Sequence, residues 1–323
     1  MHILITGSAG FLGFHLARHL LNVGLQVTLL DRFSDYYSRD LKLLRAENLK
    51  NLFGATTLNI DLAKSEELLQ LGNLSFTHIV HLAGQPGVRV TEANQLDYLN
   101  DNVTAFTNLI GLAVRQSVPN FIYASSSSIY QKAQILPFNE YETLEIPSNF
   151  YARTKYLNEK IAESFSGSIP NVCGLRFFSV YGPWGRPDMA YFKLFQAAYS
   201  SKEFVLNGTG EISRDFTFIE DVTNAIANLV NLQTAYPQVL NIGGGNVISM
   251  NQLISAIQEI TGRKINLSHK PTNLQDLQTT SADISLQEKT LGLSQKTSLQ
   301  NGLLEVYSWI QNLERVQDFL KWS

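Results

Sequence analysis

Short apolar runs alternate with amphipathic segments over the first half of the chain. Runs rich in branched residues predict strands at 2–6, 27–30, 56–60, 77–82, 121–124 and 172–177. Between them, apolar residues recur at helical spacing, most clearly over 95–117 and 150–167. This alternation predicts an α/β fold with a doubly wound parallel sheet, whose ligands bind beyond the carboxyl ends of the strands.

A glycine-rich loop separates the first strand from the first helix. Gly7, Gly10 and Gly13 are spaced three residues apart, and glycine lets backbone N–H groups approach a diphosphate closely. The helix that follows points its positive end at the same anion. Asp31 ends the second strand, where a carboxylate can accept both ribose hydroxyls of an adenosine. These features predict a bound dinucleotide, and a tight turn without a ligand is the alternative.

Two neighbouring residues bear on the choice of dinucleotide. Asp31 favours NAD, because its carboxylate would repel the 2′-phosphate of NADP. Arg32 is a competing signal, since an arginine at this point could bind that phosphate. We expect Asp31 to decide the choice in favour of NAD.

The regular alternation ends near residue 180, where 181–188 form a loop rich in glycine and proline. Beyond the loop we expect strands near 203–206, 213–218 and 237–241, and helices near 189–199, 220–232, 249–261 and 298–312. We interpret residues 1–178, with returning segments near 213–245, as the NAD-binding Rossmann domain. Residues 179–212 and 246–323 then form a smaller C-terminal α/β lobe.

Composition excludes several classes of partner. The net charge of the 323 residues is −3 and no dense run of Lys or Arg occurs, so nucleic acid and anionic membranes are poor candidates. No apolar run approaches the roughly 18 residues of a membrane span, and we expect no signal peptide. Cys173 is the only cysteine, which suits a reducing cytoplasm. His15 and His19 share a helix face without a third ligand, so we expect no metal site.

Tyr151 and Lys155 form the sharpest chemical motif. Four residues apart on a helix, they share one face. A lysine ammonium beside a phenol favours the phenolate, so we expect Lys155 to lower the pKa of Tyr151 toward neutrality and make it a general acid and base. Ser126 ends the preceding strand and can hydrogen-bond the same substrate oxygen. Alone, the pair would more often be a surface tyrosine and lysine.

The glycine loop, Ser126 and the Tyr151-Lys155 pair together resemble the extended short-chain dehydrogenases that act on nucleotide sugars. The resemblance runs along the full chain and is closest to UDP-glucuronate 4-epimerases, most specifically over residues 180–190. Residues 35–37, 85–89, 125–130 and 214–218 also follow that family's patterns. The chain departs from them at Pro86, Gln131, Ser179 and Gln275-Asp276.

This resemblance implies the residues of the site. Ser126, Tyr151 and Lys155 would be catalytic. The implied NAD-binding residues are Gly7, Gly10, Phe11, Leu12, Gly13, Asp31, Arg32, Asp61, Leu62, Leu82, Ala83, Gly84, Asn102, Tyr151, Lys155 and Phe178. The implied residues for the UDP-sugar are Gln85, Arg89, Ser127, Ser128, Ser179, Arg186, Arg214 and Asp276. For Arg186 and Arg214, a surface ion pair is the alternative, and Arg89 is similarly ambiguous.

The serines distinguish related activities. Related dehydratases and decarboxylases carry acidic residues where this chain has Ser127 and Ser128, and neutral hydroxyls cannot perform that acid–base work near pH 7. With Ser179, they can hydrogen-bond the carboxylate of a uronic acid and suppress loss of CO₂. Strand-end capping is the alternative. We therefore expect a UDP-glucuronate 4-epimerase, with a UDP-glucose or UDP-N-acetylhexosamine 4-epimerase, or a silent NAD-binding scaffold, as alternatives.

The two long amphipathic helices bear on assembly. In the resembling family, helices equivalent to 95–117 and 150–167 pair across a two-fold axis. We therefore expect a homodimer. The alternative is that both apolar faces pack only on the sheet of their own chain.

Overall fold

A seven-stranded parallel sheet forms the centre of the computed structural model, which describes residues 1–200, 202–271, 277–293, 296–313 and 321–322. The strand order is β10-β6-β5-β4-β1-β2-β3. The strands are β1 (His2–Thr6), β2 (Gln26–Asp31), β3 (Thr57–Asn59), β4 (His78–His81), β5 (Asn120–Ser126), β6 (Asn171–Phe177) and β10 (Val239–Ile242). The predicted doubly wound α/β fold is confirmed.

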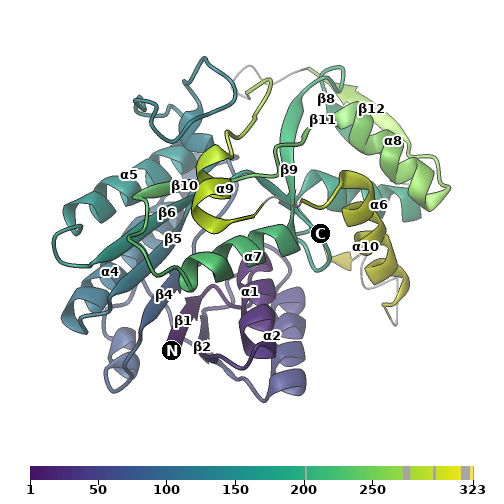
Figure 1. Ribbon diagram of the computed structural model, residues 1–323. Coiled ribbons are helices and arrows are strands. Elements are labelled where there is room, and N and C mark those ends of the chain that lie inside the picture. Colours follow the sequence, from purple (N-terminus) through teal and green to yellow (C-terminus); the bar gives the residue numbers. More distant parts are fainter. Residues whose placement is uncertain (201, 272–276, 294–295, 314–320, 323) are drawn as a thin grey trace.

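Helices cover both faces of this sheet (Figure 1). They are α1 (Phe11–Asn22), α2 (Arg39–Phe53), α4 (Ala105–Arg115), α5 (Phe150–Ser164) and α7 (Ile219–Val230). Successive strand residues point to opposite faces, so Ile3 and Ile5 join the core under α1 and α7, whereas Leu4 joins the core under α4. Burial on both faces explains why these strands read as continuous apolar runs.

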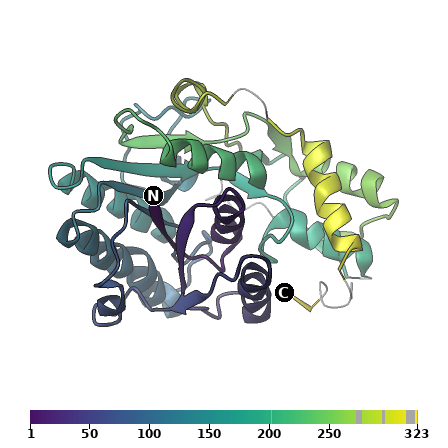
Figure 2. The same cartoon turned by 60° about the horizontal axis from the view of Figure 1, so that its bottom comes forward.

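The C-terminal half adds two small sheets to the large one (Figure 1). Helices of this half, drawn in green and yellow, lie at the right of Figure 2. Strands β7 (Ser179–Tyr181), β9 (Ser213–Phe218) and β11 (Val247–Ser249) form one, and β8 (Phe204–Asn207) and β12 (Leu267–Lys270) form the other. The helices are α6 (Ala190–Tyr199), α8 (Met250–Thr261), α9 (Ser285–Leu291) and α10 (Leu299–Gln311). Of the segments near 213–245, β10 joins the large sheet, whereas β9 pairs with β7 and β11.

The helix expected over 95–117 is interrupted. A 3₁₀ turn (Glu92–Asn94) leads into α3 (Gln95–Tyr98), a π-helical segment (Leu99–Thr104) and α4. The spacing of apolar residues cannot reveal a π segment, because such a segment is a local change in backbone hydrogen bonding. π segments often mark functional sites. Here the π segment buries Asp101 and Asn102. Further 3₁₀ turns occur at Glu67–Leu71 and Ser127–Tyr130.

Strand order reverses between the parallel neighbours β1 and β4. Strands β2 and β3 follow outward from β1 on one side, and β5, β6 and β10 follow from β4 on the other. Ligands of doubly wound folds bind at this point, beyond the carboxyl ends of the strands. No helix among the described residues is long and apolar enough to span a membrane.

Candidate active site

A cavity opens at the carboxyl ends of the central strands and gathers most of the residues predicted from the sequence. Those lining it are Gly7, Gly10, Phe11, Leu12, Gly13, Asp31, Arg32, Asp61, Leu62, Leu82, Ala83, Gly84, Gln85, Ser126, Tyr151, Lys155, Phe178 and Arg186. They come from segments up to 179 residues apart in the chain, so the fold brings the predicted cofactor residues and catalytic residues to one place.

Six predicted residues do not line this cavity, and a seventh is not described. The six are Arg89, Asn102, Ser127, Ser128, Ser179 and Arg214. Asp276 lies outside the described residues. Arg214 instead donates from Nη1 to the carbonyls of Ser213 and Leu277, at 2.9 and 2.8 Å.

Asn102 supports the cavity wall from behind. Its Oδ1 accepts the Gln85 backbone N–H at 2.7 Å, and its Nδ2 donates to the Gln85 carbonyl at 3.1 Å and to Thr154 Oγ1 at 2.9 Å. The amide thus fixes the loop after β4 to helix α5. The structure gives Asn102 a positioning role, and its contact with the cofactor stays a prediction.

The glycines let this loop pack closely against backbone, where a side chain would collide. A Cβ on Gly7 (φ +69°) would meet the Ala83 backbone nitrogen at 2.7 Å, and one on Gly13 would meet the Gly7 carbonyl oxygen at 2.1 Å. Helix α1 begins directly after Gly10 and has no side-chain cap, so its first N–H groups face the cavity end. This cradle fits the diphosphate of a dinucleotide.

Asp31 closes the adenosine side of the cavity. One carboxylate oxygen accepts the Ala9 backbone N–H at 3.0 Å and the other accepts that of Phe33 at 2.8 Å. Phe33 has the left-handed φ of 55° that this turn requires. Each oxygen keeps further lone pairs, so the carboxylate is held in place and can still accept ribose hydroxyls.

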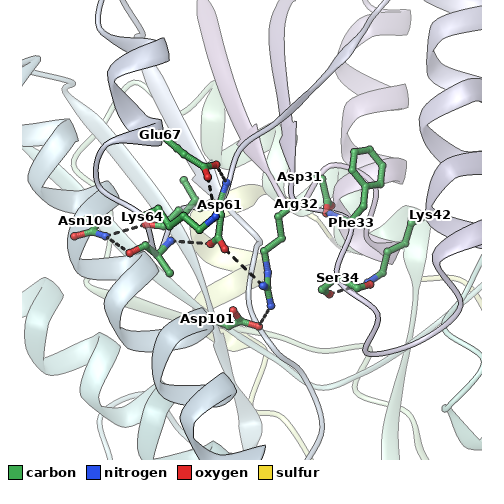
Figure 3. Close-up of polar contacts among 12 residues, drawn as sticks. Asp31, Arg32, Phe33, Ser34, Lys42, Asp61, Lys64, Glu67, Asp101 and Asn108 are labelled. Carbon is green, nitrogen blue, oxygen red and sulfur yellow. Dashed lines mark hydrogen bonds and ion pairs between the residues drawn. The ribbon is translucent and has the colours of Figure 1, made fainter.

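Arg32 is engaged by two carboxylates (Figure 3). Its Nη2 lies 2.5 Å from Asp101 Oδ2 and its Nη1 lies 3.7 Å from Asp61 Oδ2. Burial raises the pKa of Asp101, and the Arg32 guanidinium opposes that rise. The arginine that the sequence offered as a possible phosphate ligand is therefore neutralised by acidic neighbours.

Sequence reasoning did not select several lining residues that follow β2, among them Ser34, Tyr36, Tyr37 and Lys42. Lys42 donates from Nζ to the carbonyl and the hydroxyl of Ser34 (Figure 3). Burial lowers the pKa of Lys42 to about 8. Their position directly after the strand that ends in Asp31 was the available signal, because ligands of this fold bind beyond the carboxyl ends of the strands.

The three predicted catalytic residues converge on the other end of the cavity. Ser126 ends β5, whereas Tyr151 and Lys155 lie one turn apart on α5. Lys155 Nζ donates to the Ala124 carbonyl at 3.0 Å and lies 6.0 Å from the centre of the Tyr151 ring. Burial lowers the pKa of Lys155 to about 8. The predicted juxtaposition is present.

The predicted electrostatic effect on Tyr151 is wrong in direction. Burial raises the pKa of Tyr151 above its usual value, and a hydrogen bond with Ser126 is the largest opposing influence. Desolvation disfavours the phenolate more than its polar neighbours favour it. Ser126 therefore has a second role that the sequence did not suggest, since its hydroxyl favours the charged form of the tyrosine.

The serine run has local hydrogen bonds of its own. Ser126 Oγ accepts the Ser128 backbone N–H at 3.2 Å and the Ser128 hydroxyl at 2.8 Å. This is the capping arrangement considered from the sequence, and it starts the 3₁₀ turn after β5. Ser179 begins β7, directly after Phe178 of the cavity wall.

Arg186 brings a cation to the cavity from the loop 182–188. Its Nε and Nη2 lie 3.0 and 2.7 Å from the two carboxylate oxygens of Asp188. The bidentate pair fixes the plane of the guanidinium. The remaining N–H donors stay available to an anionic ligand.

The chain is similar to known proteins over nearly its whole length. The model of the NAD dependent epimerase/dehydratase family matches residues 3–243. A UDP-glucuronate 4-epimerase of Thermodesulfobacterium geofontis is 33% identical over 324 residues, which cover 98% of each chain.

Two solved structures have closely similar folds. The UDP-glucuronic acid 4-epimerase of Bacillus cereus, in complex with UDP-glucuronic acid and NAD, is 30% identical with a TM-score of 0.88, over 97% of this chain and 100% of that one. A Thermotoga maritima UDP-glucose 4-epimerase with UDP-glucose is 27% identical with a TM-score of 0.87, over 97% and 100% of the chains.

Proposed function

Because the chain belongs to the NAD-dependent epimerase/dehydratase family, we propose that it is an NAD-dependent 4-epimerase that interconverts UDP-glucuronate and UDP-galacturonate. The observation that carries this proposal is the convergence of Ser126, Tyr151 and Lys155 on the cavity that the glycine loop also borders. A protein that only senses a dinucleotide has no need of all three side chains. The similarity to UDP-glucuronate 4-epimerases supports the choice of substrate.

NAD fits the described residues. The glycine loop would hold its diphosphate and Asp31 the hydroxyls of its adenosine ribose, while Lys155 would bind the ribose near the nicotinamide. Bound NAD supplies the reversible hydride transfer that oxidises and then reduces the sugar at C4. The carboxylates around Arg32 disfavour a 2′-phosphate, which supports NAD over NADP.

The proton chemistry is assigned to Tyr151. As phenolate, it takes the proton of the C4 hydroxyl, and it returns that proton when the 4-keto sugar is reduced on its other face. Ser126 donates a hydrogen bond to the phenolate oxygen and bridges to the sugar hydroxyl. Lys155 supplies positive charge beside the ring, which opposes the cost of burying the phenolate.

The substrate carboxylate is proposed for Ser127, Ser128 and Ser179, which adjoin residues of the cavity lining. The Ser128 hydroxyl, which donates to Ser126 Oγ in the structure, would turn to the carboxylate when the sugar binds. The 4-keto sugar is a β-keto acid, which loses CO₂ when its carboxylate turns out of the ring plane. Hydroxyl donors that hold the carboxylate near that plane suppress the loss. The absence of an acidic side chain at residues 127 and 128 supports epimerisation over dehydration.

The UDP end is assigned first to Arg186, whose planar fork of donors matches phosphate oxygens and which lines the cavity. Gln85 also lines it. Arg89, Arg214 and Asp276 are proposed for the same end on the resemblance alone. The substrate lobe would then comprise residues 179–212 and 246–323, against an NAD-binding domain of residues 1–178 with the segment near 213–245.

The protein is also proposed to be a cytoplasmic homodimer. Exposed leucines on the segments expected to pair support this assembly. Leu96 is 71% exposed, Leu99 37% and Leu157 43%.

One experiment tests the activity. The purified protein is incubated separately with UDP-glucuronate, UDP-glucose and UDP-N-acetylglucosamine, without added NAD, and C4 inversion is followed by NMR. We expect inversion of UDP-glucuronate with little release of CO₂. A preference for UDP-glucose, as the Thermotoga relative's name would suggest, would replace the substrate and keep the 4-epimerase class. No inversion of any sugar would refute the proposal.

A further inference from the structure

Arg45 of helix α2 is a fully buried cation whose direct partners are uncharged. Its exposed fraction is 0%. The guanidinium donates to the Ala9 carbonyl at 2.9 Å, the Tyr37 hydroxyl at 2.7 Å, and the carbonyls of Trp184 and Gly185 at 2.5 and 3.0 Å. Among the described residues it has no ion pair. Burying an unpaired cation is costly, so these contacts serve more than packing.

The contacts of Arg45 join two loops that are about 175 residues apart in sequence. Ala9 lies inside the glycine loop, between Gly7 and Gly10. Trp184 and Gly185 lie in the loop 182–188, which carries Arg186 into the cavity. One guanidinium therefore ties the loop proposed for the cofactor diphosphate to the loop proposed for UDP.

The second loop is held along its backbone by side chains from other elements. The Gly182 carbonyl accepts the Tyr191 hydroxyl at 2.8 Å. The Pro183 carbonyl lies 2.8 Å from His15 Nε2, and burial lowers the pKa of His15 to about 3, so the neutral ring donates from this nitrogen. Arg45 holds the next two carbonyls. Four successive carbonyls thus have fixed partners.

The backbone geometry of this loop needs such support. Trp184 adopts a left-handed φ of 57°, which disfavours a bulky side chain and persists only where the surroundings enforce it. Its carbonyl is one of the two that Arg45 holds. Arg186 follows two residues later and has Asp188 as its own carboxylate partner. Loss of Arg45 would release the strained peptide and shift Arg186.

We propose that Arg45 is a positioning residue that fixes the position of Arg186 relative to the glycine loop. The sugar nucleotide and the dinucleotide would then bind at a fixed position relative to each other. This inference rests on the proposed function only for the identity of the ligand at Arg186. Arginine suits the task because its five N–H donors form a rigid planar fork, whereas lysine presents its donors at a single nitrogen.

The first test measures the loops directly, by hydrogen–deuterium exchange and mass spectrometry of the purified holoenzyme. In Arg45→Met, we expect faster exchange in peptides that cover 7–13 and 182–190, with unchanged exchange in β5 and β6. Arg45→Lys should be intermediate. Lys50→Met, which removes an exposed charge from the same helix, should match the wild type. Unchanged exchange in the two loops of Arg45→Met would overturn the proposal.

The second test asks whether Arg45 acts through Arg186. Isothermal titration with UDP alone gives dissociation constants for Arg45→Met, Arg186→Met and the double variant. We expect each single change to weaken UDP binding by roughly tenfold or more, as for loss of a charge-assisted hydrogen bond, and the double variant to lose no more than Arg186→Met. Additive losses would contradict the proposal.

The two proposals fail in different ways. UDP binding and amide exchange do not depend on epimerisation, so an inactive protein would refute the proposed function and leave Arg45 testable. If Arg45→Met does not fold, the same two measurements on Arg45→Lys test the proposal. If the folded Arg45→Lys variant showed wild-type amide exchange and wild-type UDP affinity, the hydrogen bonds from the guanidinium to its four oxygen partners would not be required, and the proposal would be refuted.

Discussion

Arg32 and Asp101 form an ion pair across the adenosine end of the cavity, with Nη2 and Oδ2 2.5 Å apart. Asp101 comes from the π-helical segment between α3 and α4. Asp61, at the end of the neighbouring strand segment, lies 3.7 Å from the same guanidinium. Together with Asp31, three carboxylates therefore lie at the end of the cavity that we propose for the adenosine.

Asp101→Asn should weaken the discrimination against NADP. The substitution removes one negative charge and frees part of the Arg32 fork, so we expect the NAD-to-NADP affinity ratio to fall about tenfold, which corresponds to about 1.4 kcal/mol. The measurement is displacement of bound NAD from the holoenzyme by increasing NADP.

Asp97→Asn is the matched control, because it removes the same charge from an exposed position of α3. Its affinity ratio should stay close to that of the wild type. An Asp101→Asn ratio equal to the control would mean that Asp31 alone sets the selectivity.

Tyr151→Phe should give a folded protein that retains NAD and loses epimerisation by about 10²–10⁴-fold. The change removes one hydroxyl and leaves the packing of α5 and the ring contact with Tyr98 in place. Initial rates with UDP-glucuronate and the NAD content of the purified variant are measured together. Near-normal turnover would rule out Tyr151 as the acid and base.

Local sequence patterns predicted the parts of the site that local geometry determines. The spacing of Gly7, Gly10 and Gly13 predicts a turn and the start of a helix. The four-residue spacing of Tyr151 and Lys155 predicts that both side chains lie on one face of a helix. Both features depend on the backbone within a few residues. The large parallel sheet was predictable for the same reason, since its buried strands are apolar runs.

The sequence could not predict effects that depend on distant neighbours. The pairing of Arg32 with Asp101 joins residues 69 apart through a π segment that apolar periodicity does not report. The raised pKa of Tyr151 results from burial, which spacing cannot measure. The local sequence does not distinguish Arg45 from other helix residues, because carbonyl oxygens that hold it come from two remote loops.

Stability should fall on acidification in part through His81. Burial lowers the pKa of His81 from 6.5 to about 3, so between these values the unfolded chain binds a proton that the folded protein does not. The free energy of unfolding therefore falls as pH drops below 6.5, by about 1.4 kcal/mol per pH unit for one proton.

His81→Gln should make the free energy of unfolding depend less steeply on pH. The slope should fall by up to about 1.4 kcal/mol per pH unit, the contribution of one proton. Denaturant unfolding at pH 7.5, 6.0 and 5.0 gives the slope, which is independent of any loss of stability common to all three values. His269→Gln, at an exposed position, serves as the matched control. A His81→Gln slope equal to that of the wild type would refute the assignment.

Leu157→Asp should convert the proposed dimer into a monomer. Leu157 is 43% exposed on α5, and a carboxylate on an apolar interface would be buried without a partner. Light scattering at micromolar concentration should give about twice the chain mass for the wild type and about the chain mass for the variant. Leu69→Asp, at a position 79% exposed and outside the two segments expected to pair, should stay dimeric. A monomeric wild type would contradict the assembly.

Ser179→Ala should damage turnover of a uronate more than turnover of a neutral hexose. The change deletes one donor at the start of β7, and a hydrogen bond to a charged group contributes roughly 1.5–3 kcal/mol. UDP-glucuronate turnover should fall by roughly ten- to a hundredfold. Release of CO₂ should rise relative to epimerisation, because the carboxylate of the 4-keto sugar is then held less firmly near the ring plane.

The comparison of substrates separates this role from a structural one. Ser179 begins a strand that pairs with β9 through Phe216, so a substitution that disturbed the strand would slow both sugars equally. We measure UDP-glucuronate and UDP-glucose side by side, with CO₂ release followed in the same samples. A uronate-specific loss assigns Ser179 to the carboxylate. Equal losses would assign it to the sheet, and the choice of UDP-glucuronate would then rest on similarity to relatives alone.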